Sequence, residues 1–311
     1  MLNCVTNYPF VTLFRTKPVL VTPHYSLKRM GKESEAAEVL FENQERNGAK
    51  GRDSGGWMAR IITGIVLFMP VLSWAAHPLI TDDSSTQGKG GFQLEVNGQY
   101  DSDQETVAGV SNKSSGGQVG ATLSFGIIEN VDLVLSLAYA WGRVEEDGTT
   151  VYDEKGISDM TFEVKWRFFE KEGWSFTLKP GVSFPTGDEN KGLGTGKTGY
   201  HVFLIASKEV ESWGFHANLG YIGNENKVDE EKNIWHASLA TTYEVVKDLK
   251  VVGNIGIERS PDKTSNNDPA FLIGGVIYSV SKNFDLDFGV KYGLASSETD
   301  LSVLAGIAFR F

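Results

Sequence analysis

Cysteine is almost missing from this chain of 311 residues. The single one, Cys4, lies near the start, and the long remainder of the sequence contains none. A disulfide framework requires at least two cysteines, and cysteine-ligated metal sites usually require several. The sequence therefore excludes a fold stapled by disulfides and a metal centre built from thiolates.

Long apolar runs are also missing. No stretch reaches the roughly 18–20 consecutive apolar residues that a membrane-spanning helix needs. A helical membrane protein is therefore excluded. A transmembrane β-barrel is not, because each of its strands needs only about ten residues of alternating polarity.

Basic residues are scarce in the part of the chain that shows a folding pattern. After residue 75 there are 34 acidic and 20 basic residues, an excess of 14 negative charges. Such a chain repels the phosphates of nucleic acids. We therefore predict no nucleic-acid partner.

Residues 58–75 have the pattern of a secretory signal peptide. Arg60 supplies the positive start, residues 61–72 are apolar, and the sequence ends on Ser73-Trp74-Ala75, a small-x-small cleavage site. We predict cleavage before Ala76 and export. Residues 1–57 are polar and aperiodic, and two hypotheses stay open: upstream sequence before a true start at Met58, or a disordered extension.

From residue 92 onward, apolar and polar residues alternate with the period of two that is typical of β-strands. The last stretch, residues 301–311, is the clearest example. One alternative is an ordinary edge strand of a soluble β-domain. The pattern predicts twelve strands, at residues 92–100, 119–127, 131–141, 160–168, 174–184, 200–207, 213–221, 235–245, 251–257, 270–280, 284–294 and 301–311.

The connections between these strands alternate between long and short along the whole chain. Bacterial outer-membrane barrels have this asymmetry, with short periplasmic turns and longer outer loops, whereas a soluble sandwich has no reason for it. We therefore predict that residues 76–311 form an all-β, transmembrane antiparallel up-and-down barrel of about 12 strands. Its partners would be outer-membrane lipid and lipopolysaccharide. The terminal aromatics Phe309 and Phe311 would be the signal for the barrel-assembly machinery.

One face of nearly every predicted strand is polar or charged, and in a membrane barrel this face lines the lumen. It could form the wall of a permeation path, or a set of cross-strand ion pairs that stiffens the barrel. The predicted lumen-lining residues are Glu95, Asp132, Asp159, Glu163, Lys165, Arg167, Lys179, Glu244, Lys250, Glu258, Asp285, Asp287, Lys291 and Arg310.

Two predicted strands break the alternation, which places apolar side chains in the lumen. Two interpretations remain open: packing against a plug or an inward-folded loop, and a patch that receives hydrophobic or aromatic solutes. The predicted apolar lumen patch consists of Phe203, Ile205, Phe271, Ile273 and Ile277.

Histidine is the remaining residue type with chemistry to consider. His201, His216 and His236 fall on predicted inner faces and could hold a metal, but lumen polarity explains them equally well. No histidine faces lipid to activate a serine there. We therefore predict neither metal, cofactor nor catalytic residues, and not an enzyme.

Short motifs resemble a known family. They are His77-Pro-Leu-Ile-Thr-Asp-Asp83, Thr86-Gln-Gly-Lys-Gly90, Phe92-Gln-Leu-Glu95, Phe184-Pro-Thr-Gly187 and the terminal Phe311. The chain is similar to the outer-membrane family named for the meta-cleavage pathway of phenol degradation. The resemblance implies a barrel that serves as a transporter or channel, sometimes associated with aromatic catabolism, and supplies no catalytic residues.

The expected function is passive passage of small solutes through the bacterial outer membrane, with hydrophobic or aromatic compounds as one candidate class. A closed structural or adhesive barrel that acts through its outer loops is the alternative, and a hydrolase at the rim is a third.

Overall fold

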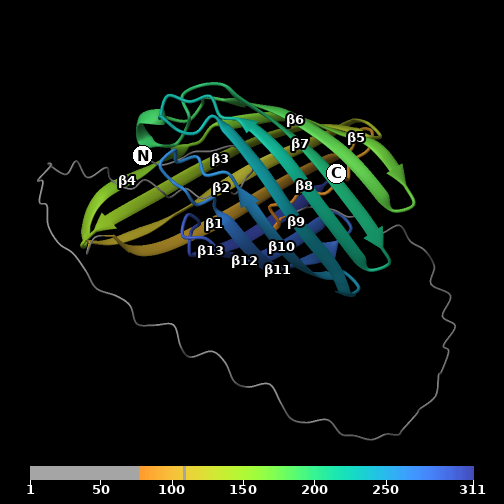
Figure 1. Ribbon diagram of the computed structural model, residues 1–311. Helices are drawn as coiled ribbons and strands as arrows, with labels where there is room; N and C mark the ends of the chain where they lie inside the picture. The colour runs from red at the N-terminus through yellow and green to blue at the C-terminus, as the bar shows by residue number, and fades with distance from the viewer. Residues whose placement is uncertain (1–76, 108–109) are drawn as a thin grey trace, which may run out of the picture. The chain divides into compact units, whose positions relative to one another are not determined.

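The computed structural model describes residues 77–107 and 110–311 (Figure 1). The extension predicted for residues 1–57 and the signal peptide predicted for residues 58–75 lie outside the described residues, so both stay predictions. The described part is almost entirely strand, with one short 3₁₀ helix, η1, at Glu189–Lys191. No helix in those two described ranges is long and apolar enough to cross a membrane.

Thirteen described strands form one antiparallel sheet that closes on itself. Strands adjacent in the chain pair with each other, except β4 and β5. β1 pairs with β13, and β3 pairs with β2, β4 and β5. Twelve strands thus make the predicted up-and-down barrel, which is confirmed, and β4 is an additional strand. The strands are β1 (Phe92–Val107), β2 (Val110–Ile128), β3 (Val131–Glu146), β4 (Thr149–Ile157), β5 (Met160–Lys171), β6 (Trp174–Phe184), β7 (Gly199–Val210), β8 (Trp213–Gly223), β9 (Asn233–Val246), β10 (Leu249–Glu258), β11 (Ala270–Ser281), β12 (Phe284–Gly293) and β13 (Leu301–Arg310).

Strand β4 lies in the connection between the strands predicted at residues 131–141 and 160–168, where the alternation predicts no strand, and that prediction is wrong. Strand β3 continues to Glu146 and turns back through Asp147 and Gly148 into β4. Both turn residues have positive φ, 45° and 80°, the backbone of a two-residue hairpin turn whose twist matches its strands. The Asp-Gly pair was the local signal for this hairpin.

The hairpin of β1 and β2 is also longer than the sequence predicts. A loop is expected between Tyr100 and Gly117, but the ladder continues to the pair Val107–Val110. This extension is polar, with Asp103 among its residues. A strand that continues beyond the lipid needs no apolar face, so the alternation that marks the spanning part is lost there.

The barrel wall carries its apolar face outside and its polar face inside. Leu219 and Leu239 are 61% and 59% exposed, whereas their sequence neighbours Asn218 and Ser238 are 1% and 5% exposed. A sheet on a water-soluble core has the opposite arrangement, because apolar side chains leave water. The inverted arrangement is that of a barrel surrounded by lipid.

Aromatic side chains gather near the rim of short turns. The rings of Trp213 and Tyr243 are 4.4 Å apart between centroids, and Trp174 stacks on Phe176 at 6.1 Å. The ammonium of Lys208 lies 5.2 Å from the centre of the Trp174 ring. Amphipathic rings beside a cation are typical of the interface between lipid and water.

The end of the chain closes the barrel. The N–H of Phe311 donates to the carbonyl of Phe92 at 3.0 Å, and the N–H of Phe92 donates back at 3.3 Å. Phe309 stacks on Phe284 with centroids 4.4 Å apart, while Phe311 is 72% exposed. The role of Phe309 and Phe311 as an assembly signal stays a prediction.

We expect Leu239→Arg, at the middle of β9, to lower the free energy of unfolding in phospholipid bilayers by about 2–4 kcal/mol. The reason is that an arginine on the lipid face at mid-depth must lose its hydration. Leu294→Arg, just past the end of β12, should cost about 0–1 kcal/mol because its side chain lies near the interface. Denaturant titration followed by tryptophan fluorescence measures both. Equal costs at the two positions would contradict the lipid-facing assignment.

Candidate functional site in the barrel interior

Of the residues before β1, those from His77 to Gln87 lie inside the barrel, and those from Gly88 to Gly91 lie at its rim. They reach β1 at the rim of short turns, where the N–H of Gly90 donates to the carbonyl of Gly126 at 2.8 Å. Just inside this rim, the Thr86 hydroxyl donates to the Glu129 carbonyl at 2.9 Å, and the Gln87 N–H donates to Asp132 at 2.9 Å. We call residues 77–87 the interior segment.

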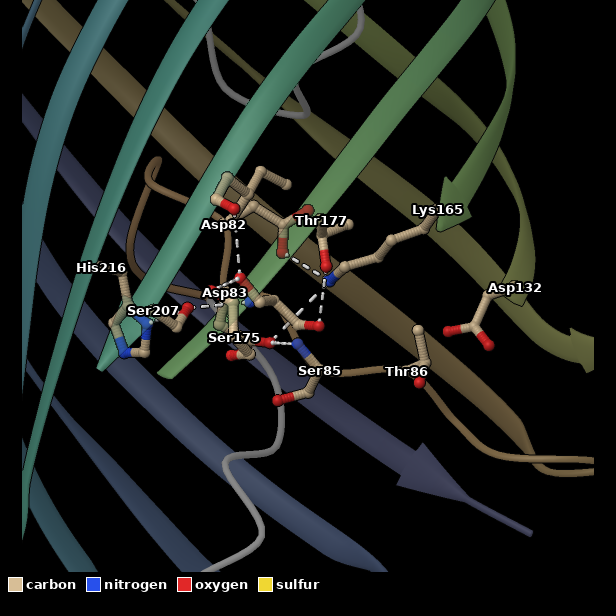
Figure 2. Close-up of polar contacts among 12 residues, drawn as sticks. Asp82, Asp83, Ser85, Thr86, Asp132, Lys165, Ser175, Thr177, Ser207 and His216 are labelled. Atoms are coloured by element: carbon tan, nitrogen blue, oxygen red, sulfur yellow. Dashed lines mark hydrogen bonds and ion pairs between the residues drawn. The ribbon is translucent and has the colours of Figure 1, made fainter. Parts of the chain in front are cut away.

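The interior segment contacts strands at different positions around the barrel wall. Ser84 bonds to β6 and β7: its N–H donates to the Ser207 hydroxyl at 2.9 Å, and its carbonyl accepts from the Thr177 hydroxyl at 2.9 Å. The Ser207 hydroxyl also lies 2.9 Å from Nδ1 of His216. Figure 2 shows these side chains converging on the segment.

Further along, β10 holds the segment through one amide side chain. Oδ1 of Asn254 accepts from the N–H of Ile80 at 2.7 Å and of Thr81 at 3.1 Å, and its Nδ2 donates to the Thr81 hydroxyl at 2.7 Å. Asn218 on β8 faces the backbone of Asp82 in the same manner, at 2.7 Å to the N–H and 2.9 Å to the carbonyl. These amides replace the water that an isolated peptide would bind.

Two glycines allow the start of the segment to approach the wall. A Cβ at Gly275 on β11 or Gly289 on β12 would lie 2.7 or 2.8 Å from the ring of Pro78, closer than side-chain packing permits. The neighbouring His77 bonds through Nδ1 to the carboxylate of Asp287 on β12. The wall is thus shaped to receive this segment.

A cluster of charges fixes the middle of the segment. The carboxylate of Asp82 bridges two lysines, with Oδ1 at 3.0 Å from Nζ of Lys165 and Oδ2 at 3.1 Å from Nζ of Lys179. Lys165 is also 3.8 Å from Asp83, and Lys179 is 3.2 Å from Glu163. Buried charges are costly unless they are paired, and here each has a partner of opposite sign.

The pKa of Asp82 shows how strong this arrangement is. Burial by itself raises the pKa of the carboxyl group, but the ammonium groups of Lys165 and Lys179 outweigh it and hold the pKa well below its ordinary value. The interaction therefore contributes stability at every pH above the ordinary pKa of an aspartate, and it is lost as the pH falls toward the lowered value.

Apolar side chains of the wall meet the same segment. Ile80 packs in a cluster with Phe203, Ile205, Phe271 and Ile273, all at most 5% exposed. Leu79 packs in a second cluster. The first cluster also includes Ile222, Ile234 and Leu304, and the second contains Ala240, Val252 and Ile277. The sequence left two interpretations of the apolar patch open, packing against a plug and binding of solutes. In this structure the patch packs against the interior segment, as the first interpretation predicts.

The structure spreads the other predicted lumen residues along the wall in small polar groups. Arg310 bonds to Asp285 at 2.5 Å and to Gln93 at 3.0 Å, and Lys291 pairs with Glu298 at 3.1 Å. The predicted lumen residues other than Asp159 differ in burial. Nine are buried: Asp132, Glu163, Lys165, Lys179, Glu258, Asp285, Asp287, Lys291 and Arg310. Four are partly exposed: Glu95, Arg167, Glu244 and Lys250.

Asp159 has a different position from the one predicted. It lies between β4 and β5, not on a strand, and accepts from the N–H groups of Gly187 and Thr195, both at 2.9 Å. The burial of this carboxyl group raises its pKa above the ordinary value. Asp159 thus holds the loop between β6 and β7 in place. Its role in lining the lumen stays a prediction.

The three predicted inner histidines lie apart, each with its own protein partner. Nε2 of His201 is 2.9 Å from Glu163, and Nδ1 of His236 is 3.0 Å from Glu258, while His216 contacts Ser207. Among the residues that the structure describes, no group of three or more histidine, cysteine or acidic side chains is arranged to hold a metal.

Sequence reasoning missed the interior segment itself. Residues 77–90 are irregular in sequence and carry no strand pattern. One signal was available: the apolar pair Leu79-Ile80 stands directly beside the acidic pair Asp82-Asp83, and the predicted lumen holds both an apolar patch and lysines. Matching the two required knowledge of which strands are neighbours.

Comparisons with known proteins agree with this architecture. Residues 75–311 match the model of the family described as "Putative MetA-pathway of phenol degradation". The COG4313 outer membrane channel from Pseudomonas putida F1 is similar in structure, with a TM-score of 0.61 and 15% identity over 74% of this chain and 98% of that chain. No curated protein matches the sequence.

Two further solved barrels align less closely. The KdgM porin aligns with a TM-score of 0.46 at 9% identity, over 70% of this chain and 99% of that chain. The translocator domain of the autotransporter NalP from Neisseria meningitidis aligns with a TM-score of 0.45 at 12% identity, over 72% and 89%. At such identities, the likeness to the Pseudomonas channel shows the barrel fold.

Labelling of an introduced cysteine tests how the interior segment is held. Thr81 is fully buried, and no cysteine follows Cys4, so Thr81→Cys gives a chain that begins at Ala76 a single thiol. We expect a membrane-impermeant maleimide to label it slowly. Adding Asp82→Ala should speed labelling about tenfold or more, because loss of both lysine pairs raises the population of the released segment.

Thr149→Cys, exposed in the hairpin of β3 and β4, is the control and should label at the same rate with and without Asp82→Ala. Retained heat-modifiable mobility on gels shows that both variants are folded. Slow labelling of Thr81→Cys in both backgrounds would mean that the charge cluster does not hold the segment.

Proposed function

This chain belongs to the phenol-degradation family whose model spans residues 75–311, and from that membership we propose that it is an outer-membrane channel for the passive passage of small solutes. The similar Pseudomonas structure is described as an outer membrane channel, which supports the same role. The solutes include hydrophobic or aromatic compounds in this proposal, and the protein has no catalytic function.

The observation that carries the proposal is how the interior is filled. A barrel of twelve strands encloses more space than the side chains of its wall occupy. Here the interior segment takes up part of that space, and it is not a strand of the wall. It is held by hydrogen bonds and ion pairs, such as those of Asp82 and Asn254, which water and solutes can replace. Such a segment can move without breaking the barrel.

The closed structural or adhesive barrel remains the second candidate. Its outer loops are held by specific contacts. Asp159 accepts hydrogen bonds from the loop between β6 and β7, and Lys227, between β8 and β9, pairs with Glu189 of that loop at 2.8 Å. In that case the interior segment would be a permanent part of the core. The two candidates differ in whether ions pass.

Single-channel recording in planar bilayers separates them. We expect the exported chain to give small or brief conductance steps. A variant in which residues 78–84 are replaced by a Gly-Ser sequence of equal length should give steps several-fold larger and longer, because the contacts to Lys165, Lys179 and Asn254 are gone. Leu294→Ala, on the outer face at the rim, is the control and should conduct like the parent.

Heat-modifiable mobility on gels must first show that each barrel is folded. Folded barrels that stay silent, with and without the native segment, would overturn the channel and favour the closed barrel.

A further inference from the structure

The wall beneath the interior segment forms one continuous surface with two kinds of chemistry. Lys179 on β6 is the cross-strand partner of Phe203 on β7, and Ile205 on β7 is the partner of Asn218 on β8. A cation, an amide and two apolar side chains therefore lie side by side. Lys165 on β5 completes the cationic end, because it shares the carboxylate of Asp82 with Lys179.

The interior segment occupies this surface as a ligand would. Ile80 fills the apolar end, among Phe203, Ile205 and Phe271. Two residues later, Asp82 presents each of its carboxylate oxygens to a different lysine, at 3.0 and 3.1 Å. A carboxylate held by two cationic donors, one to each oxygen, is a strong and specific contact. The pair Ile80 and Asp82 thus imitates a small molecule with an apolar body and one carboxylate.

The charge balance of the wall points to an anion. When the segment leaves, Asp82 and Asp83 leave with it. Lys165 and Lys179 then face Glu163, which is 3.2 Å from Lys179 and 2.9 Å from His201. The wall then keeps two ammonium groups beside two carboxylates, Glu163 and Asp132, the latter being the cross-strand partner of Lys165 on β3. The site has lost the two negative charges of Asp82 and Asp83, and an anion that enters it restores negative charge beside the lysines.

We infer that Lys165, Lys179, Asn218 and the apolar cluster around Phe203 form a binding site for small carboxylates with an apolar body, and that such solutes compete with Asp82 of the interior segment for it. The inference rests on the proposed channel function, since it names the class of solute that passes. The carboxylate binds the lysines, the apolar body replaces Ile80, and the displaced segment opens the path.

Benzoate is a suitable probe, and isothermal titration of the full exported chain in detergent measures its binding. Benzamide has the same shape without the charge, and acetate has the charge without the apolar body. We expect benzoate to bind saturably and the other two to bind at least about tenfold more weakly, since each lacks one half of the contacts. Inorganic phosphate distinguishes a general anion site from a carboxylate site.

Variants on the two sides of the interaction should change benzoate affinity in opposite directions. Asp82→Asn removes the internal competitor and should raise the affinity about tenfold, because the site is then available in a larger fraction of molecules. Lys179→Met should lower it about tenfold, and Lys179→Arg should keep most of it. Lys282→Met, in the exposed turn between β11 and β12, is the matched control and should leave the affinity unchanged.

A folded Asp82→Asn barrel that binds benzoate no better than the parent would overturn the competition. Equal binding of benzoate and phosphate would overturn the carboxylate class. Conductance of the same variants separates this inference from the function it rests on. A barrel that conducts but does not bind benzoate would support the channel function and overturn the binding site. A barrel that binds benzoate but does not conduct would support the binding site and overturn the channel function.

Discussion

Hydrocarbon offers no hydrogen-bond partner to a peptide N–H or C=O, and the architecture of this chain follows from that constraint. A sheet in lipid must have no open edge, so β1 pairs with β13 and the last residue, Phe311, bonds to Phe92 at the seam. Because lipid surrounds the barrel, its wall also places apolar side chains outside and polar side chains inside, the reverse of a soluble protein. Leucines such as Leu239 face outward, where a soluble protein would place polar groups, and polar side chains such as Ser238 face inward.

The inverted wall creates the conditions for the interior site. A closed sheet of twelve strands encloses a polar space that its own side chains do not fill. Charges that face this space need partners, because an unpaired buried charge is costly. Lys165 and Lys179 find theirs in Asp82 of the interior segment, and the apolar side chains around Phe203 find Ile80. One short stretch of chain therefore satisfies both the charges and the apolar surface of the wall.

The way in which the interior segment is held also connects stability with function. Its contacts are hydrogen bonds through Asn254 and Ser207, ion pairs through Asp82, and the packing of Leu79 and Ile80. None of these is part of the strand ladder, so releasing the segment leaves the hydrogen bonds of the barrel intact. A channel and a carboxylate site are consistent with this separation, because the wall supplies rigidity while the segment can exchange with a solute.

The sequence by itself determined the barrel, its twelve spanning strands and which face of those strands is apolar. A strand has a period of two, so the alternation around Leu239 or Phe309 states which side is apolar without knowledge of any neighbour. It failed at the hairpin of β3 and β4 and at the outer part of β1, where strands leave the lipid and lose that pattern. Only the tertiary structure decided that Asp82 meets Lys165 and Lys179, and that Ile80 meets Phe203. These contacts join residues 83 or more positions apart. They depend on which strands closure brings together around one interior, which no local pattern records.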